Sequence, residues 1–151
     1  MGVKLPPIEK IHEAYSAIAD KRVVLKENEA EVSSSDLKKT YLVKWKDEVY
    51  SANDNASYWQ GYVGYPIIAV LMLQGKLSLN QEIAMYFQGI NWKKINTEYK
   101  NKFSEAVSKI MGELKEKGID CNKIEEEIQK VYQEIGNLTI QTKRSSIRPP
   151  K

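Results

Sequence analysis

Residues 50–65 combine side chains that suit the binding of a small ligand. They contain five of the fourteen aromatic residues of the chain, together with amides, small hydroxyl side chains and glycines. Flat rings, amide donors and acceptors, and a backbone that a ligand can approach closely are common parts of small-molecule sites. We therefore expect the following candidate ligand-binding residues: Asn53, Asp54, Asn55, Ser57, Tyr58, Trp59, Gln60, Tyr62 and Tyr65.

The same segment has two other interpretations. Asn53, Asp54 and Asn55 are typical of turns and helix caps, and aromatic rings can close a core while their polar tips bond locally. The segment is then a structural plug, and all of its polar atoms are bonded within the protein. Alternatively, Asp54 acts as a lone general acid or base, which requires a cleft and a shifted pKa. The sequence leaves enzymatic activity open and favours binding without catalysis.

Within this segment, the run Tyr-Ser-Ala-Asn-Asp-Asn is followed by Trp-Gln-Gly-Tyr-Val-Gly-Tyr-Pro. These residues are similar to those of small archaeal proteins of unknown function, and the order of predicted elements extends the resemblance over most of the chain. The resemblance implies no activity, substrate or catalytic residue. The function must therefore be argued from the side chains themselves.

Other chemistry is scarce in the chain. One histidine and one cysteine exclude most catalytic triads and multi-ligand zinc sites, and no phosphate-binding glycine motif is present. We expect no metal and no cofactor. His12 is interpreted as a half-buried, hydrogen-bonded side chain, and Cys121 as a plain thiol at a helix start. The single cysteine and the short apolar run at 66–73 predict a cytoplasmic protein without a membrane partner.

A nucleic acid is the alternative partner. The net charge is +3, but four positive charges lie in residues 142–151, so the rest of the chain is nearly neutral. A basic surface is still possible if lysines gather on one face, with Tyr41 or Trp45 available for base stacking. The lysines that would form it, together with the tail, are Lys38, Lys39, Lys44, Lys46, Lys93 and Lys94. A surface for a protein partner or a second copy cannot be told apart from ordinary packing.

The periodicity of the first half predicts a helix followed by strands. Apolar residues at positions 8, 11, 15 and 18 share one helical face. Residues 23–26 and 30–33 alternate as a hairpin, and residues 40–46 form a half-exposed strand with Tyr41, Val43 and Trp45 on one face. Residues 48–51 complete an antiparallel meander of three or four strands.

The second half predicts helices. Residues 66–73 form a buried helix, and Ser78 with Gln81 reads as a capping box for a short helix ending near Gly89. Asn91 caps a single long helix that runs to about Lys117 on an apolar stripe of three- and four-residue spacing. Asp120 caps the last helix, which completes an antiparallel helical hairpin. The prediction is thus an α+β domain of residues 1–141 with a basic flexible tail at 142–151.

Overall fold

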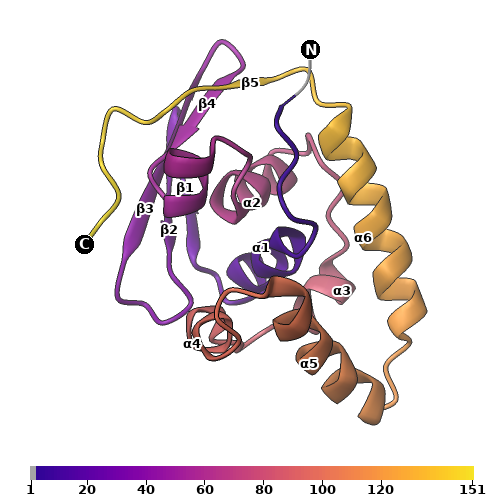
Figure 1. Cartoon of the computed structure of the whole chain (residues 1–151). Coiled ribbons are helices and arrows are strands. Elements are labelled where there is room, and N and C mark those ends of the chain that lie inside the picture. Colours follow the sequence, from indigo (N-terminus) through magenta and orange to yellow (C-terminus); the bar gives the residue numbers. More distant parts are fainter. Residues whose placement is uncertain (1–2) are drawn as a thin grey trace.

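The computed structural model describes residues 3–151 and shows the predicted α+β class, with helices stacked on one face of a five-stranded sheet (Figure 1). The helix α2 lies directly against the sheet, α1 packs beside α2, and α6 packs against α1. The strands follow in sequence order across the sheet. They are β1 (Val23–Leu25), β2 (Glu29–Ser33), β3 (Thr40–Lys46), β4 (Val49–Ala52) and β5 (Gln141–Thr142).

The first four strands form the predicted antiparallel meander. Its register places Ala30 opposite Val43 and Val32 opposite Tyr41, so that four buried side chains share the face that meets the helices. β3 and β4 are joined by Asp47 and Glu48, which have positive φ angles of 52° and 65°. Positive φ at both central residues gives the twist that a two-residue hairpin turn requires.

The fifth strand was missed by the sequence prediction. Gln141 and Thr142 pair in parallel with Val49 and Tyr50 of β4. The Gln141 and Lys143 amides donate to the carbonyl oxygens of Glu48 and Tyr50, at 2.9 and 3.0 Å. Two residues are too few to show an alternating pattern, so this strand depends on a partner 92 positions away in the chain and not on its own sequence.

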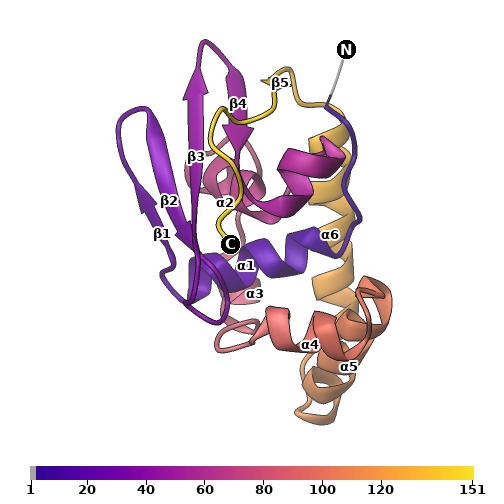
Figure 2. The ribbon, with the colours of Figure 1, turned by 60° about the vertical axis from the view of Figure 1, so that its left-hand side comes forward.

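The helix α1 (Lys10–Ala19) is buried on all sides. Ile11 and Tyr15 lie on the predicted apolar stripe, and Ala14, Ser16 and Ala17 on the other faces are just as inaccessible. α2 (Tyr65–Leu73) packs beside it as the predicted buried helix, and both lie between the sheet and α6 (Cys121–Gly136) in Figures 1 and 2. α1 is therefore the centre of the core, and any polar side chain on it must find a partner or a cavity.

The capping residue of α3 (Gln81–Met85) was predicted two positions too early. Asn80 is the cap, and its Oδ1 accepts the Ile83 amide at 3.1 Å. Ser78 instead donates from its amide and its hydroxyl to the two carboxylate oxygens of Glu134 on α6. The local motif predicted Ser78 as the cap, but the serine hydroxyl donates instead to a residue 56 positions away on another helix.

The predicted single helix from Trp92 to Lys117 is wrong, because the structure divides it into α4 (Trp92–Glu98) and α5 (Phe103–Glu116). Lys100 and Asn101 have left-handed φ angles of 53° and 63°, which an α-helix cannot include. The Asn101 amide closes the break by donating to the Asn96 carbonyl oxygen at 2.7 Å. The predicted caps Asn91 and Asp120 are confirmed. Among the residues described, no helix is long and apolar enough to cross a membrane.

Candidate ligand-binding site

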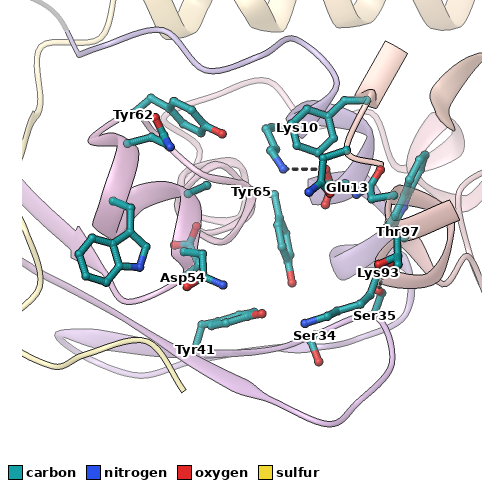
Figure 3. A pocket seen from close by; sticks show the side chains of 18 of the residues that line it. Lys10, Glu13, Ser34, Ser35, Tyr41, Asp54, Tyr62, Tyr65, Lys93 and Thr97 are labelled. Atoms are coloured by element: carbon teal, nitrogen blue, oxygen red, sulfur yellow. Dashed lines mark hydrogen bonds and ion pairs between the residues drawn. The ribbon is translucent and has the colours of Figure 1, made fainter. Parts of the chain in front are cut away.

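A cavity of about 460 Å³ opens where β4 leads into the helices (Figure 3). This volume lies within the range of small-molecule sites. Six of the nine candidate residues line it: Asp54, Asn55, Trp59, Gln60, Tyr62 and Tyr65. The remaining lining residues come from α1, from both sides of the β1–β2 hairpin, from β3, from the start of the short helix at 56–60 and from the α4–α5 region. They are Lys10, Glu13, Arg22, Ser34, Ser35, Tyr41, Ala56, Trp92, Lys93, Asn96, Thr97, Asn101 and Phe103.

A short π-helix, η1 (Ala56–Gln60), positions the aromatic and amide side chains of this wall. The Ser57 amide donates to the Asp54 carboxylate at 3.1 Å and so fixes the start of the turn. The turn ends at Gly61, whose φ of 76° is left-handed and therefore favours glycine. Single π-helical turns occur frequently at functional sites. Here the wide turn leaves the Trp59 side chain 61% exposed.

Three of the candidate residues lie outside the cavity. Asn53 is buried and bonded on both sides, since its Oδ1 accepts the Leu42 amide and its Nδ2 donates to the Arg148 carbonyl oxygen. The Ser57 hydroxyl accepts the Gly64 amide at 3.1 Å. Tyr58 packs under the Arg144 guanidinium, 5.1 Å from the ring centre. Asn53 and Ser57 thus hold the segment together.

Asp54 is a buried carboxylate with one unpaired oxygen. Its side chain borders the cavity and is 4% exposed, and Oδ1 has no hydrogen-bond partner, whereas Oδ2 accepts from Ser57. Burial raises the pKa of Asp54, while the hydrogen bonds from Ser57 and the Lys10 charge act in the opposite direction. A carboxyl group with an unpaired oxygen can accept a hydrogen bond from a ligand, or donate one when it is protonated.

Lys10 and Glu13 form a buried ion pair at the back of the cavity, with Nζ and Oε2 3.2 Å apart. The Lys10 ammonium also lies 3.9 Å from the centre of the Phe103 ring on α5, which adds a cation–π contact. Burial raises the pKa of Glu13, and the neighbouring Lys10 charge lowers it in part. The pair therefore neutralises itself and joins α1 to α5.

Arg22 supplies a cation whose hydrogen bonds are incomplete. Its Nη1 donates to the Ser33 carbonyl oxygen at 2.7 Å, and its Nε lies 3.6 Å from Asp20 Oδ2. The Nε and Nη2 atoms make no hydrogen bond, although the residue is only 6% exposed. Buried polar groups are normally paired, so unpaired N–H groups beside a cavity indicate space for an acceptor.

Tyr41 and Tyr65 meet edge to face, with ring centres 6.4 Å apart. Burial raises the pKa of Tyr41 to about 12 and raises the pKa of Tyr65 as well. Both hydroxyls consequently keep their protons at neutral pH and can donate hydrogen bonds. In Figure 3 the two hydroxyls and the Lys93 ammonium point toward the same part of the cavity.

Of the charged residues of the site, Asp54 was a predicted ligand-binding residue and Lys93 was predicted only as part of a basic surface. The sequence did not indicate Lys10, Glu13 or Arg22. Lys10 and Glu13 resemble the solvent-exposed face of an ordinary helix, and only the uncharged run at 14–19 indicates that this helix is surrounded by core. Asn101 and Phe103 reach the cavity through the break between α4 and α5, which was not predicted. Arg22 and Lys93 have no local motif at all.

His12 and Cys121 lie away from this cavity. His12 is 6% exposed and packs edge to face against Phe87 at 5.4 Å. The prediction of a half-buried ring was wrong, because the residue is buried, and among residues 3–151 no hydrogen-bond partner lies at its Nδ1. Cys121 begins α6 as predicted and is half-buried. Within residues 3–151, no group of three or more histidine, cysteine, aspartate and glutamate side chains is placed to hold a metal ion.

The two aromatic residues predicted for the alternative nucleic-acid surface, Tyr41 and Trp45, lie at different places in the structure. Tyr41 is buried in the cavity wall, whereas Trp45 is half-buried and stacks on Tyr50, with ring centres 5.8 Å apart. Trp45 borders a second, smaller groove with four basic side chains and one acidic side chain. They are Lys44, Lys46, Lys143, Arg144 and Glu29.

Comparison with known proteins gives a family but no activity. The family model described as "Uncharacterised conserved protein UCP014422" matches residues 3–141. No curated protein and no solved structure matches the chain significantly. The description of the family names no source, so the archaeal resemblance stays a prediction.

Proposed function

The chain belongs to the family described as uncharacterised conserved protein UCP014422, and because this membership brings no activity with it, we propose from the cavity alone that the protein binds a small ligand with a flat body and polar groups. The observation that carries the proposal is the unpaired hydrogen-bonding capacity of buried groups on the cavity wall. Asp54 Oδ1 and Arg22 Nη2 make no hydrogen bond with any residue from 3 to 151, although both residues are nearly inaccessible.

Such groups lower the stability of the folded protein as long as they have no hydrogen-bond partner. A buried donor or acceptor without a partner costs about 1–3 kcal/mol, and more when it is charged. A ligand that pairs with Asp54 and Arg22 recovers part of this cost. The exposed Trp59 ring and the Tyr62 ring supply flat surfaces beside these groups. Geometry of this kind suits a rigid polar molecule of about metabolite size.

The test is a screen of a metabolite library by saturation-transfer NMR, repeated on a variant in which the opening of the cavity is blocked. Thr97 is exposed on the cavity rim, so Thr97→Trp blocks the opening without changing the core. Thr139→Trp is the matched control, because Thr139 is also exposed and does not line the cavity. We expect ligands of the wild type to bind the control and to lose at least tenfold in affinity for Thr97→Trp. Absence of any ligand, or equal binding to both variants, contradicts the proposal.

The groove beside Trp45 supports nucleic-acid binding as a second candidate function. Lys44 and Lys46 on β3 meet Lys143 and Arg144 of the C-terminal segment there, next to an aromatic ring that is half-buried. Cations can bind phosphates while the ring stacks on a base. Fluorescence anisotropy with single- and double-stranded oligonucleotides at increasing salt tests this function.

If the second candidate is right, affinity falls steeply with salt, because phosphate binding releases counterions. The double variant Lys44→Gln/Lys46→Gln then has a smaller salt slope than the wild type. The control Lys123→Gln, on the exposed surface of α6, keeps the slope of the wild type. Binding that does not change with salt, or that is unaffected by the double variant, excludes this groove.

A further inference from the structure

We propose that the ligand of the cavity carries a carboxylate or phosphate group, and that Arg22, Tyr41, Tyr65 and Lys93 bind this group. The inference rests on the proposed ligand-binding function and specifies the chemistry of the ligand. The four side chains come from four separate places in the fold: the residue before β1, the strand β3, the helix α2 and the helix α4. Their convergence is therefore a product of the tertiary structure.

All four side chains present hydrogen-bond donors. The Arg22 and Lys93 side chains have donors only, and buried tyrosine hydroxyls that keep their protons donate readily. Tyr41 lies against Tyr65, and Arg22 lines the same cavity as both tyrosines. Figure 3 shows both hydroxyls and the Lys93 ammonium directed toward one part of the cavity.

Among the residues that the structure describes, most of these donors have no acceptor, and Arg22 Nη1, which donates to the Ser33 carbonyl oxygen, is the exception. In Figure 3 the one interaction drawn between lining side chains is the ion pair of Lys10 and Glu13, and none joins Tyr41, Tyr65 or Lys93 to another residue shown. The Arg22 Nε and Nη2 atoms make no hydrogen bond either. A carboxylate or phosphate has several oxygen acceptors close together, which is the group that such a cluster of donors binds best.

The charges of the site also favour an anion. Glu13 is already paired with Lys10, and Asp20, which lies 3.6 Å from Arg22, accepts the Gly89 amide and does not line the cavity. Burial lowers the pKa of Lys93, the neighbouring Lys39 lowers it further, and the Asp36 charge acts in the opposite direction. Three cationic side chains, Lys10, Arg22 and Lys93, line the cavity beside two acidic ones, Glu13 and Asp54. Burial raises the pKa of both acids, so an anionic ligand would compensate the remaining positive charge.

The experiment compares matched pairs of probes that differ in the acidic group. Indole-3-acetate and indole-3-acetamide form the carboxylate pair, and uridine 5′-monophosphate and uridine form the phosphate pair. Binding is measured by isothermal titration calorimetry on the wild type and on Tyr65→Phe and Lys93→Gln. Tyr86→Phe and Lys94→Gln are the controls, because neither residue lines the cavity. These variants leave Arg22 intact, since Arg22 also bonds to the Ser33 carbonyl oxygen and its loss would disturb the fold.

We expect the acid of at least one pair to bind at least tenfold more tightly than its neutral partner. Tyr65→Phe and Lys93→Gln should each reduce that preference by about three- to tenfold, the loss expected for one hydrogen bond of average net strength, and the controls should leave it unchanged. The pair that shows the preference distinguishes a carboxylate from a phosphate ligand. Equal binding of acid and neutral partner, or failure of all four probes at a cavity that binds other compounds, overturns this inference while the proposed function stands. If no compound binds the wild-type protein in a way that Thr97→Trp weakens, the proposed function itself is wrong.

Discussion

Gly64 occupies the point where the candidate site meets the core. A Cβ added there would overlap Asp54 Oδ2 and would lie 2.7 Å from Ser57 Oγ. Its φ of −74° is accessible to every residue, so the requirement for glycine is one of space and not of backbone conformation. The close approach keeps the Asp54 carboxylate beside the Ser57 amide.

We predict that Gly64→Ala lowers the free energy of unfolding by about 1–3 kcal/mol, because a methyl group overpacks a filled space. The same variant should weaken ligand binding, since Asp54 must move. Gly112→Ala is the control, because a Cβ at that position in α5 meets nothing within 4 Å and should stabilise the helix by up to about 1 kcal/mol. Chemical denaturation measures both effects. Equal stability of Gly64→Ala and the wild type would show that Asp54 is not held as described.

Because His12 is buried, we predict that the free energy of unfolding of the protein depends on pH. Burial lowers its pKa from 6.5 to about 4. The unfolded chain therefore takes up a proton before the folded chain does, so this residue stabilises the fold above pH 6.5 and the contribution is lost as the pH falls toward 4. The change corresponds to about 3 kcal/mol. Glu13 and Asp54, whose pKa values are raised, act with the opposite sign, since protonation favours their folded forms.

The contribution of His12 is isolated by comparison with His12→Gln. Between pH 7 and pH 4 the variant should gain about 3 kcal/mol relative to the wild type, because only the wild type carries the buried imidazole. Urea unfolding at several pH values gives the two free energies. A difference between the proteins that stays constant with pH would mean that the imidazole titrates normally and is accessible to water.

At the scale of elements, the ion pair of α1 connects three helices around the cavity. Lys10 contacts Phe103 of α5, and Glu13 lies close enough to Asn96 of α4 for a side-chain hydrogen bond that lowers its pKa. Both charged residues are less than 10% exposed. Removal of one charge leaves the other buried without a partner, which destabilises the fold. Replacement of both residues by apolar ones leaves no unpaired charge, and the two apolar side chains can pack in the same space.

We predict that Lys10→Met and Glu13→Leu each destabilise the protein by about 3 kcal/mol at neutral pH, and that the double variant lies within about 1–2 kcal/mol of the wild type. Lys10→Met should cost less at pH 5, because Glu13 can then become protonated. A double-mutant cycle in denaturant measures the coupling. Additive effects of the two substitutions would show that the ion pair is not formed in solution.

Elements with a strong local pattern were predictable, and those that depend on distant partners were not. The alternation of Tyr41, Val43 and Trp45 indicated β3, and the caps Asn91 and Asp120 marked two helix starts. The break after α4 was hidden because the apolar spacing continues through it while Lys100 and Asn101 adopt left-handed φ. The aromatic wall of the site was therefore predictable from sequence, but most of its charged residues were not.

At the scale of the whole molecule, the C-terminal segment returns to the sheet. β5 pairs with β4, the Arg148 carbonyl oxygen accepts Asn53 Nδ2 at 3.2 Å, and Arg144 lies over the rings of Tyr58 and Trp59. In Figure 2 this segment runs along the sheet on the side away from α6. The flexibility of residues 142–151 stays a prediction, and it can be tested by removing these contacts.

Deletion of residues 143–151 should lower the free energy of unfolding by about 1–3 kcal/mol, because a buried amide and two rings lose partners. The unfolding transition should stay cooperative, since the core does not include these residues. Arg144→Gln separates the ring contact from the backbone pairing and should cost less than the deletion. If the deletion leaves stability and the Trp59 fluorescence unchanged, the tail is an independent, flexible extension.

The ligand-binding site can be located by ¹H–¹⁵N correlation NMR on the wild type with a compound from the library screen. We predict that amide signals within residues 54–62 and 92–97 shift together with the indole N–H signal of Trp59, because most residues of these two segments line the cavity. Shifts confined to the groove beside Trp45, or spread evenly over the surface, would contradict the assignment of this cavity as the binding site.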